Sequence, residues 1–173
     1  MNYKRLFIEN SYVFITVITY DRQHILIDNI NILRESFKNS FSKYNYELVA
    51  IVVNKDHMHF IIHPKNIYDY PKIVAEIKRF FTKHINKNYD LNKNNEANIW
   101  QRRYWEHTIR DETDLRRHID YIHYNPVKHY NIAPKDWEFS SFNKFVELGY
   151  YEQDWYNIDD KYKINDLGAD YGE

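Results

Sequence analysis

Two β-prone runs lie almost next to each other in this 173-residue chain. Residues 46–53 read YELVAIVV, residues 57–63 read HMHFIIH, and only the polar break Asn54-Lys55-Asp56 separates them. β-Branched and aromatic residues favour strands, and a short polar break between two such runs favours a turn. The sequence therefore predicts an antiparallel hairpin over residues 46–63, which commits the chain to a sheet.

The segments around the hairpin complete a mixed pattern of strands and helices. Apolar residues recur at helical spacing in two segments, and the other segments are β-branched or aromatic. The helix that begins after Asp111, a good N-cap residue, is expected to end before Asn125-Pro126, because a residue that precedes proline avoids the helical region. The predicted elements are a strand over 11–20, a helix over 29–44, strands over 46–53 and 57–63, a helix over 70–87, a loop over 88–98, a strand over 99–109 and a helix over 112–124.

This order matches the split βαβ pattern. We therefore predict an α+β fold, a ferredoxin-like or RRM-like antiparallel sheet with helices on one face and an added C-terminal helix that carries Tyr121. The length fits one domain, which we assign to residues 1–150. Residues 151–173 are predicted to be an acidic C-terminal tail.

Composition excludes several classes of protein. The chain has no cysteine, which rules out disulfides, thiolate metal sites and a cysteine nucleophile. No apolar run approaches the ~20 residues that a membrane helix needs, and the N-terminus lacks the apolar core of a secretory signal. We expect a soluble, cytoplasmic protein without a membrane partner.

The net charge of −1 conceals an asymmetry along the chain. Residues 150–173 contain seven acidic residues and two lysines, a net charge of −5, which leaves +4 on the first 149 residues. A mildly basic body permits a nucleic-acid partner without demonstrating one. The acidic tail is expected either to be a solvated appendage or to fold over the basic surface and compete with DNA.

The triplet His57-Met58-His59 offers a pair of metal ligands. Side chains alternate between the two faces of a strand, so the two histidines share one face while Met58 points into the core on the other. Two imidazoles held in this way can bind a metal ion, although two partly exposed surface histidines would show the same spacing. His63 falls on the same face further along, as a surface or supporting residue.

Tyr121 and Asn125 lie one helical turn apart and can reach the same point. The asparagine amide oxygen could be a third ligand beside two imidazoles. A tyrosine phenol becomes a nucleophile only when it is deprotonated, so at neutral pH it needs a metal ion or a base nearby. Taken alone, one tyrosine among 17 is more often part of the core or surface.

Arginines and aromatic residues alternate in the run WQRRYWEH over residues 100–107. This pattern suits stacking of unpaired bases and neutralisation of phosphates, although aromatic strands are commonly core. A basic stripe on the helix over 70–87 could follow a DNA backbone or simply be a solvated face. The candidate DNA-binding residues are Arg102, Arg103, Lys78, Arg79, Lys83, Trp100 and Tyr104.

Together these segments resemble a known family. His57-Met58-His59 resembles the HUH motif, and Tyr121 with Asn125 resembles a single nucleophilic tyrosine with a polar metal ligand one turn later. The stretches 99–107, 120–129 (DYIHYNPVKH) and 137–141 (WEFSS) resemble the REP-associated tyrosine transposases, members of the single-tyrosine HUH, IS200-like transposase superfamily. The resemblance covers roughly residues 5–150.

The resemblance implies an enzyme that cleaves and rejoins single-stranded DNA, often beside a hairpin. Tyr121 would form a covalent 5′-phosphotyrosine intermediate, and His57, His59 and Asn125 would hold a divalent metal ion, Mg²⁺ or Mn²⁺. Two imidazoles suit Mn²⁺ better than Mg²⁺, so we expect tighter Mn²⁺ binding. The partner would be single-stranded or hairpin DNA, and the enzyme a monomer or homodimer with its site built within one chain.

Three alternatives stay open at this point. The chain could be a catalytically inactive, domesticated DNA- or RNA-binding protein of the same fold. It could be a ferredoxin-like RNA-binding module that presents aromatic residues on its sheet. It could also be a hydrolytic metalloenzyme that uses water, which would leave Tyr121 without a role. Metal-dependent cleavage and a comparison of DNA with RNA separate these possibilities.

Overall fold

The hairpin lies within a four-stranded antiparallel sheet, seen in a computed structural model that describes residues 5–85, 97–157 and 171–172. The strand order is β2-β3-β1-β4, which is the order of a split βαβ fold and confirms the predicted topology. The strands are β1 (Val13–Ile18), β2 (Tyr46–Val53), β3 (His57–Pro64) and β4 (Trp105–Thr108).

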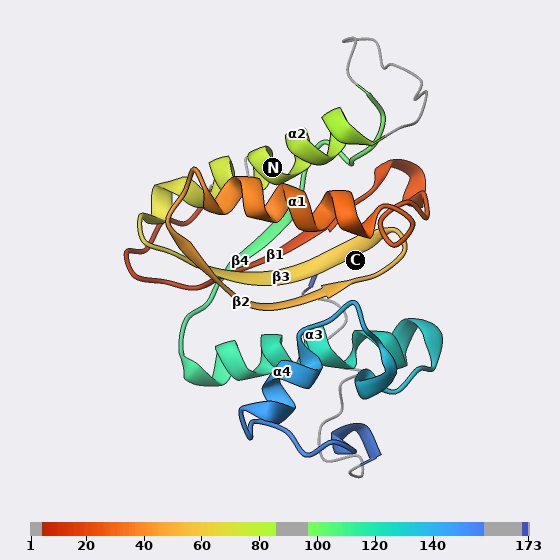
Figure 1. Ribbon diagram of the computed structural model, residues 1–173. Helices are drawn as coiled ribbons and strands as arrows, with labels where there is room; N and C mark the ends of the chain where they lie inside the picture. Colours follow the sequence, from red (N-terminus) through yellow and green to blue (C-terminus); the bar gives the residue numbers. More distant parts are fainter. Residues whose placement is uncertain (1–4, 86–96, 158–170, 173) are drawn as a thin grey trace.

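Helices cover both faces of this sheet (Figure 1). On one face lie α1 (Ile30–Phe41) and α2 (Tyr70–His84), and on the other lie α3 (Glu112–Tyr130) and α4 (Phe142–Glu147). The predicted additional helix is therefore α3, and it packs on the face opposite to α1 and α2. Short 3₁₀ turns occupy Tyr20–Arg22, Ile67–Asp69, Pro134–Asp136 and Trp155–Asn157.

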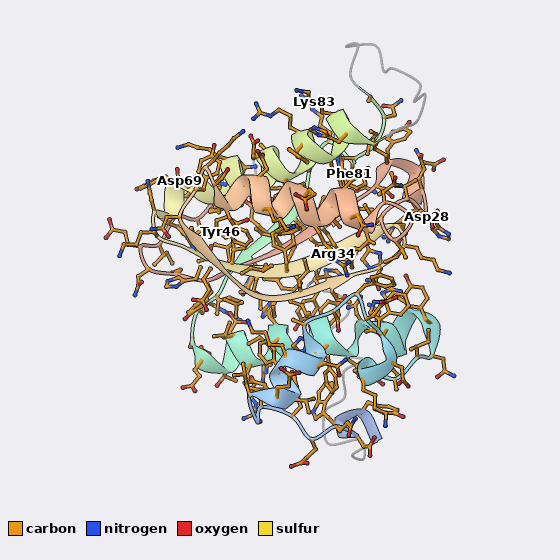
Figure 2. All side chains as sticks on the ribbon, in the orientation of Figure 1. Asp28, Arg34, Tyr46, Asp69, Phe81 and Lys83 are labelled. Atoms are coloured by element: carbon orange, nitrogen blue, oxygen red, sulfur yellow. The ribbon has the colours of Figure 1, made fainter. Side chains whose placement is uncertain are left out.

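Each face of the sheet has its own hydrophobic core, and side chains fill both spaces between the layers (Figure 2). Met58, Phe60 and Ile62 of β3 pack under α1 and α2, as the alternation of the strand predicts. The next residue, Ile61, faces α3 and α4 instead. All six residues of β1 are buried, because this central strand is covered on both sides.

The predicted strand over 99–109 is wrong in its first half. Only Trp105–Thr108 pair with β1, although Trp100 forms an isolated bridge with Thr19. The chain contacts β1 again where the backbone N–H of Gln101 donates to Ile18 O at 2.9 Å. Residues 102–104, between the contact of Gln101 and the start of β4 at Trp105, leave the ladder, and Arg102 and Arg103 are exposed there.

The predicted end of the last long helix is also wrong. Asp111 caps α3 as expected, its side chain accepting from Asp114 N at 2.8 Å, but the helix continues through Pro126 to Tyr130. Tertiary contacts override the local effect of proline: Tyr130 stacks on Trp137 with ring centroids 4.7 Å apart, and its hydroxyl accepts from Lys55 N at 3.0 Å. Asn125 therefore lies within a helix.

Most of the predicted loop over 88–98, and residues 158–170 of the predicted tail, lie outside the described residues. Before that gap, Tyr151 is buried against α3 and α4, and Trp155 packs beside it. The packed body thus extends a few residues beyond position 150. Among the described residues, no helix is both long enough and apolar enough to span a bilayer.

Two buried histidines make the stability of this fold depend on pH. Burial lowers the pKa of His118 to about 4 and that of His123 to about 3. Below about pH 6.5 the unfolded chain protonates both residues while the folded chain keeps them neutral, so the unfolded state binds more protons. The contribution of these two histidines to the free energy of unfolding is therefore fully present above about pH 6.5 and is lost as the pH falls towards 4.

We expect the free energy of unfolding to decrease by several kcal/mol between pH 7 and pH 4.5, since each pKa unit corresponds to about 1.4 kcal/mol. Urea unfolding at a series of pH values measures this decrease. His123→Gln should make the dependence shallower, whereas His24→Gln, at an exposed histidine, should leave it unchanged. If the free energy of unfolding of His123→Gln depended on pH as steeply as that of His24→Gln, His123 would not be a source of the pH dependence.

Candidate active site

The β1–β3 register brings the two histidines of the triplet to the face covered by α3. His57 pairs with Ile18 and His59 pairs with Thr16 across the ladder. Their rings lie 5.0 Å apart between centroids, and they are 2 % and 0 % exposed. These histidines are therefore not surface residues, and their nitrogens must find partners inside the protein.

The partner of His57 on one side is the carboxylate of Asp56. His57 Nδ1 lies 2.6 Å from Asp56 Oδ1, and Arg22 Nη1 lies 3.3 Å from Asp56 Oδ2. Burial alone would raise the pKa of Asp56, but the hydrogen bond with His57 and the nearby Arg22 lower it to about 2. An ionised Asp56 accepts the proton of Nδ1, which leaves a lone pair on His57 Nε2.

His59 is held in the same way by a hydroxyl. Its Nδ1 lies 2.8 Å from Thr16 Oγ1, and that hydroxyl donates its proton to Tyr171 O at 2.7 Å. The hydroxyl oxygen therefore accepts from Nδ1–H, and His59 Nε2 keeps its lone pair. A hydrogen bond from Nδ1–H to an oxygen orients the ring of a histidine that binds metal through Nε2.

Helix α3 presents Tyr121 and Asn125 to these histidines. The Tyr121 ring stands edge-on to His59, with centroids 5.2 Å apart. Asn125 is fully buried, and its Nδ2 donates to Tyr121 O at 3.2 Å, so its Oδ1 is left as the acceptor. The structure thus brings together the four side chains that the sequence singled out, His57, His59, Tyr121 and Asn125.

A fifth side chain, Asn54, joins β3 to α3 at this point. Its Nδ2 donates to Asn125 Oδ1 at 2.7 Å and lies 3.0 Å from His57 Nε2. Asn54 is fully buried, and its Oδ1 has no hydrogen-bond partner among the described residues. In the sequence, Asn54 is visible only as part of the polar turn before His57.

Tyr121 is itself only 1 % exposed, because the end of the chain covers it. The Tyr171 ring stacks on the Tyr121 ring at 3.9 Å with an interplanar angle of 12°. Gly172 lies against Trp105, so closely that a Cβ added there would come within 2.4 Å of the indole. No pattern in the sequence predicted that Tyr171 would lie in this position.

A lysine two helical turns further along α3 reaches the phenol of Tyr121. Lys128 Nζ donates to Tyr121 Oη at 3.3 Å and lies 5.2 Å from the centre of its ring. A cation in this place stabilises the negative charge of a phenolate. The exposed His129 lies next to it, with its ring 4.9 Å from that of His57. Helical spacing from Tyr121 and Asn125 is the signal that could have identified both residues.

The donor set fits a divalent ion such as Mn²⁺ or Mg²⁺. Two imidazole rings and an amide oxygen gather beside Tyr121, and the amino group of Asn54 contacts His57 Nε2 and Asn125 Oδ1 between them. Carbonyl oxygens suit both ions, and imidazole suits transition metals. The ligands proposed from the sequence, His57, His59 and Asn125, therefore have the chemistry that the site requires.

The candidate DNA-binding residues fall into two groups. Arg102 and Arg103 line a surface cleft of about 650 Å³ with Gly172 and with Thr16, whose hydroxyl contacts His59. Tyr104 lines the same cleft, and Arg5 lies over its ring at 5.2 Å. These residues share one region with the active site.

The remaining candidates lie on or beside α2, on the face of the sheet opposite to α3. Lys78 Nζ donates to Gln101 O at 2.9 Å, and burial lowers its pKa to about 8. Arg79 pairs with Glu76, while Lys83 is exposed on the outer side of α2 (Figure 2). Trp100 packs on Phe81, and its Nε1 donates to the carbonyl of Lys78 and the hydroxyl of Thr82. The structure does not bring this group to the site of Tyr121.

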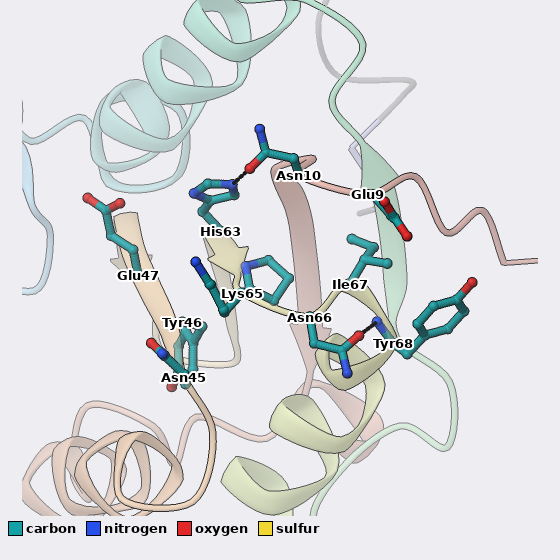
Figure 3. A pocket seen from close by; sticks show the side chains of 11 residues that line it. Glu9, Asn10, Asn45, Tyr46, Glu47, His63, Lys65, Asn66, Ile67 and Tyr68 are labelled. Carbon is teal, nitrogen blue, oxygen red and sulfur yellow. Dashed lines mark hydrogen bonds between the residues drawn. The ribbon is translucent and has the colours of Figure 1, made fainter.

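His63 lies away from the other two histidines of β3. It lines a polar cleft at the far end of the strand, where its Nε2 lies 3.2 Å from Asn10 Oδ1 (Figure 3). Tyr12 stacks on its ring at 4.4 Å. His63 is therefore a surface residue, which was one of the two expectations from the sequence.

A second histidine group could hold a metal ion by its spacing. His107, Asp114 and His118 place one ligand atom each within 4.8 Å of one another. However, Asp114 Oδ2 already accepts from His107 Nε2 at 2.8 Å and from the backbone and side chain of Arg110. Because an arginine already neutralises the carboxylate, the group works as an ion-pair network that fastens α3 to β4.

The chain as a whole is similar to known transposases. The family model described as "Transposase IS200 like" matches residues 7–125, so the chain belongs to the IS200-like transposases, enzymes that cleave and join DNA. A protein of Haemophilus influenzae known as "Putative REP-associated tyrosine transposase" is 41 % identical over 162 residues, covering 89 % of this chain and 92 % of the relative. The REP-associated tyrosine transposase of Escherichia coli K12 is 36 % identical over 156 residues, covering 88 % and 89 %.

A solved structure is similar over nearly the whole chain. It is described as a REP-associated tyrosine transposase bound to a REP hairpin. Its TM-score is 0.80 at 33 % sequence identity, and the match covers 94 % of this chain and 95 % of that one. The similarity confirms the fold and the family that the sequence motifs indicated.

Asp114→Asn tests the role of the histidine–arginine network. We expect the free energy of unfolding to fall by about 3 kcal/mol, because the substitution removes the negative charge of the carboxylate to which His107 and Arg110 both donate. Urea unfolding at pH 7 measures this loss, and Asp136→Asn, at an exposed aspartate, is the control. If a chelator instead destabilised the wild type as much as the substitution does, and had no effect on Asp114→Asn, the group would be a metal site.

Proposed function

We propose that this chain cleaves and rejoins single-stranded DNA beside a hairpin, with Tyr121 as the nucleophile. The observation that carries the proposal is the convergence of Tyr121 on two histidines whose Nε2 lone pairs are directed by Asp56 and Thr16. A surface pair of histidines would not need such support. The similar protein solved with a REP hairpin supports a hairpin partner for this chain.

The bonds that change in the reaction belong to a phenol and a phosphodiester. Tyr121 Oη gives its proton to water and attacks the scissile phosphorus in line, and the bond from phosphorus to the 3′-oxygen breaks. The 3′-oxygen takes up a proton and leaves as a hydroxyl, while the 5′-phosphate stays on the tyrosine. Because a phosphotyrosine ester conserves the energy of the bond, a second 3′-hydroxyl can reverse the step and join strands.

Several side chains prepare this step. Lys128 stabilises the phenolate of Tyr121, and Asn125 holds the helix backbone at Tyr121 O. His57, His59 and Asn125 would hold a divalent ion, which polarises the phosphate and offsets its developing charge. We expect Mn²⁺ to bind more tightly than Mg²⁺, because two of the three ligands are imidazoles.

The cleft beside the site supplies contacts for the DNA backbone. Arg102 and Arg103 are exposed in it, and they neutralise phosphates whether or not the strand is paired. Residues 102–104 leave the sheet at this point, so their side chains can follow an irregular strand. All four proposed catalytic residues come from one chain, so a monomer suffices for activity.

A second candidate function is DNA binding without cleavage. It is favoured by one observation, the stacking of Tyr171 on Tyr121, which removes the phenol from solvent. In an active enzyme this contact must open when DNA binds. In an inactive, domesticated protein it would be permanent.

Tyr121→Phe tests the nucleophile. With Mn²⁺ and a labelled hairpin oligonucleotide, the wild type should form a covalent adduct that survives denaturing electrophoresis, and the variant should form none. The matched control is Tyr124→Phe, at a half-buried tyrosine on the same helix. Equal adduct formation by Tyr121→Phe would show that another residue attacks the phosphate.

Deleting residues 157–173 tests the cover over the site. If the tail competes with DNA, the shortened chain should form the adduct several-fold faster and bind single-stranded DNA more tightly at low salt. Tyr171→Ala should have a similar effect, whereas Tyr171→Phe, which keeps the ring, should behave as the wild type does. Unchanged rates in the shortened chain would eliminate the competition, and absence of any adduct would favour the inactive protein.

A further inference from the structure

Asn54 occupies the first position of the turn that leads into the histidine pair. Its backbone N–H donates to His57 O at 2.8 Å, which closes the turn between β2 and β3. Its side chain is fully buried and points to Asn125 on α3. The turn therefore fixes an amide beside two of the proposed metal ligands.

Two lone pairs converge on the amide nitrogen of Asn54. One belongs to His57 Nε2, because Nδ1 of the same ring is engaged by Asp56. The other belongs to Asn125 Oδ1, because the nitrogen of that amide donates to Tyr121 O. The amino group of Asn54 faces them at 3.0 and 2.7 Å, so it lies between two of the proposed metal ligands.

The amide oxygen of Asn54, by contrast, contacts no hydrogen-bond donor in the described part of the chain. It is buried without a hydrogen-bond partner, an unfavourable position for a polar group removed from water. Half a turn of the amide about its Cβ–Cγ bond would exchange nitrogen and oxygen. The oxygen would then face the same two lone pairs, an arrangement of three acceptors that is stable only around a cation.

We propose that Asn54 is a fourth protein ligand of the divalent ion, through Oδ1. This inference rests on the proposed metal site of His57, His59 and Asn125. Two imidazole nitrogens and two amide oxygens suit Mn²⁺, and they leave two positions of a six-coordinate ion for phosphate oxygens. Without an ion, the amino group of the same side chain satisfies the ligands and keeps them in place.

Titration of the full-length chain with Mn²⁺ alone, followed by calorimetry, tests the assignment. Asn54→Leu keeps the shape of the side chain but removes its oxygen, and we expect it to bind Mn²⁺ at least 10-fold more weakly, the size of effect seen for groups around a metal. Asn54→Asp keeps an oxygen at the same place and should bind Mn²⁺ at least as tightly as the wild type. Asn143→Leu, at an exposed asparagine on α4, is the control and should bind normally.

Thermal unfolding separates a ligand from a residue that merely holds the fold. Without metal, Asn54→Asp should melt below the wild type, because its carboxylate faces two lone pairs, and Mn²⁺ should raise its melting temperature by more than it raises that of the wild type. Wild-type affinity in Asn54→Leu would overturn the inference. An Asn54→Asp variant that binds as weakly as Asn54→Leu would also overturn it, because the donor hydrogens would then be what matters.

His57→Ala distinguishes a failure of this inference from a failure of the proposed function. If His57→Ala weakens Mn²⁺ binding and Asn54→Leu does not, the metal site stands and Asn54 is not part of it. If His57→Ala binds Mn²⁺ as the wild type does, the proposed site itself is wrong. The calorimetric readout involves no DNA, so neither result depends on cleavage.

Discussion

The pairing of β1 with β3 is the interaction on which the rest of the molecule depends. Every residue of β1 is buried, and its register sets Thr16 opposite His59 and Ile18 opposite His57. A slip of one residue would turn both histidines into the core under α1 and α2. The same pairing separates the two hydrophobic cores. The register of β1 with β3 therefore determines both the stability of the sheet and the direction in which the two histidines point.

Short-range patterns were sufficient to predict much of this architecture. The alternation in β3 placed Met58 and His59 on opposite faces, and the spacing of four residues placed Tyr121 and Asn125 together, as the structure confirms. The end of α3 could not be predicted in this way. The effect of Pro126 is local, whereas the contacts of Tyr130 that extend the helix come from distant parts of the chain.

The surroundings of the site were the least predictable part. Thr16 supports His59 across 43 residues of sequence, and Tyr171 reaches Tyr121 from the end of the chain. Asn54 had the appearance of a turn residue, because a sequence does not show where an amide is buried. The aromatic residue Trp100 was equally ambiguous, since nothing in its neighbours indicates that Phe81 and the backbone of α2 receive it.

The attachment of α3 at both ends has a mechanical consequence. Asp114 ties its first turn to β4, and Tyr130 ties its last turn to the loop that precedes His57. Because α3 is attached to the sheet at both ends, it resists rigid-body movement, and the phenol of Tyr121 between these two contacts keeps its position. Under the proposed function, the DNA must therefore bend to bring its phosphate to Tyr121. A duplex, with a persistence length of about 150 base pairs, resists a sharp bend far more than an unpaired strand does. The stiffness of the protein would then select the flexible form of its substrate.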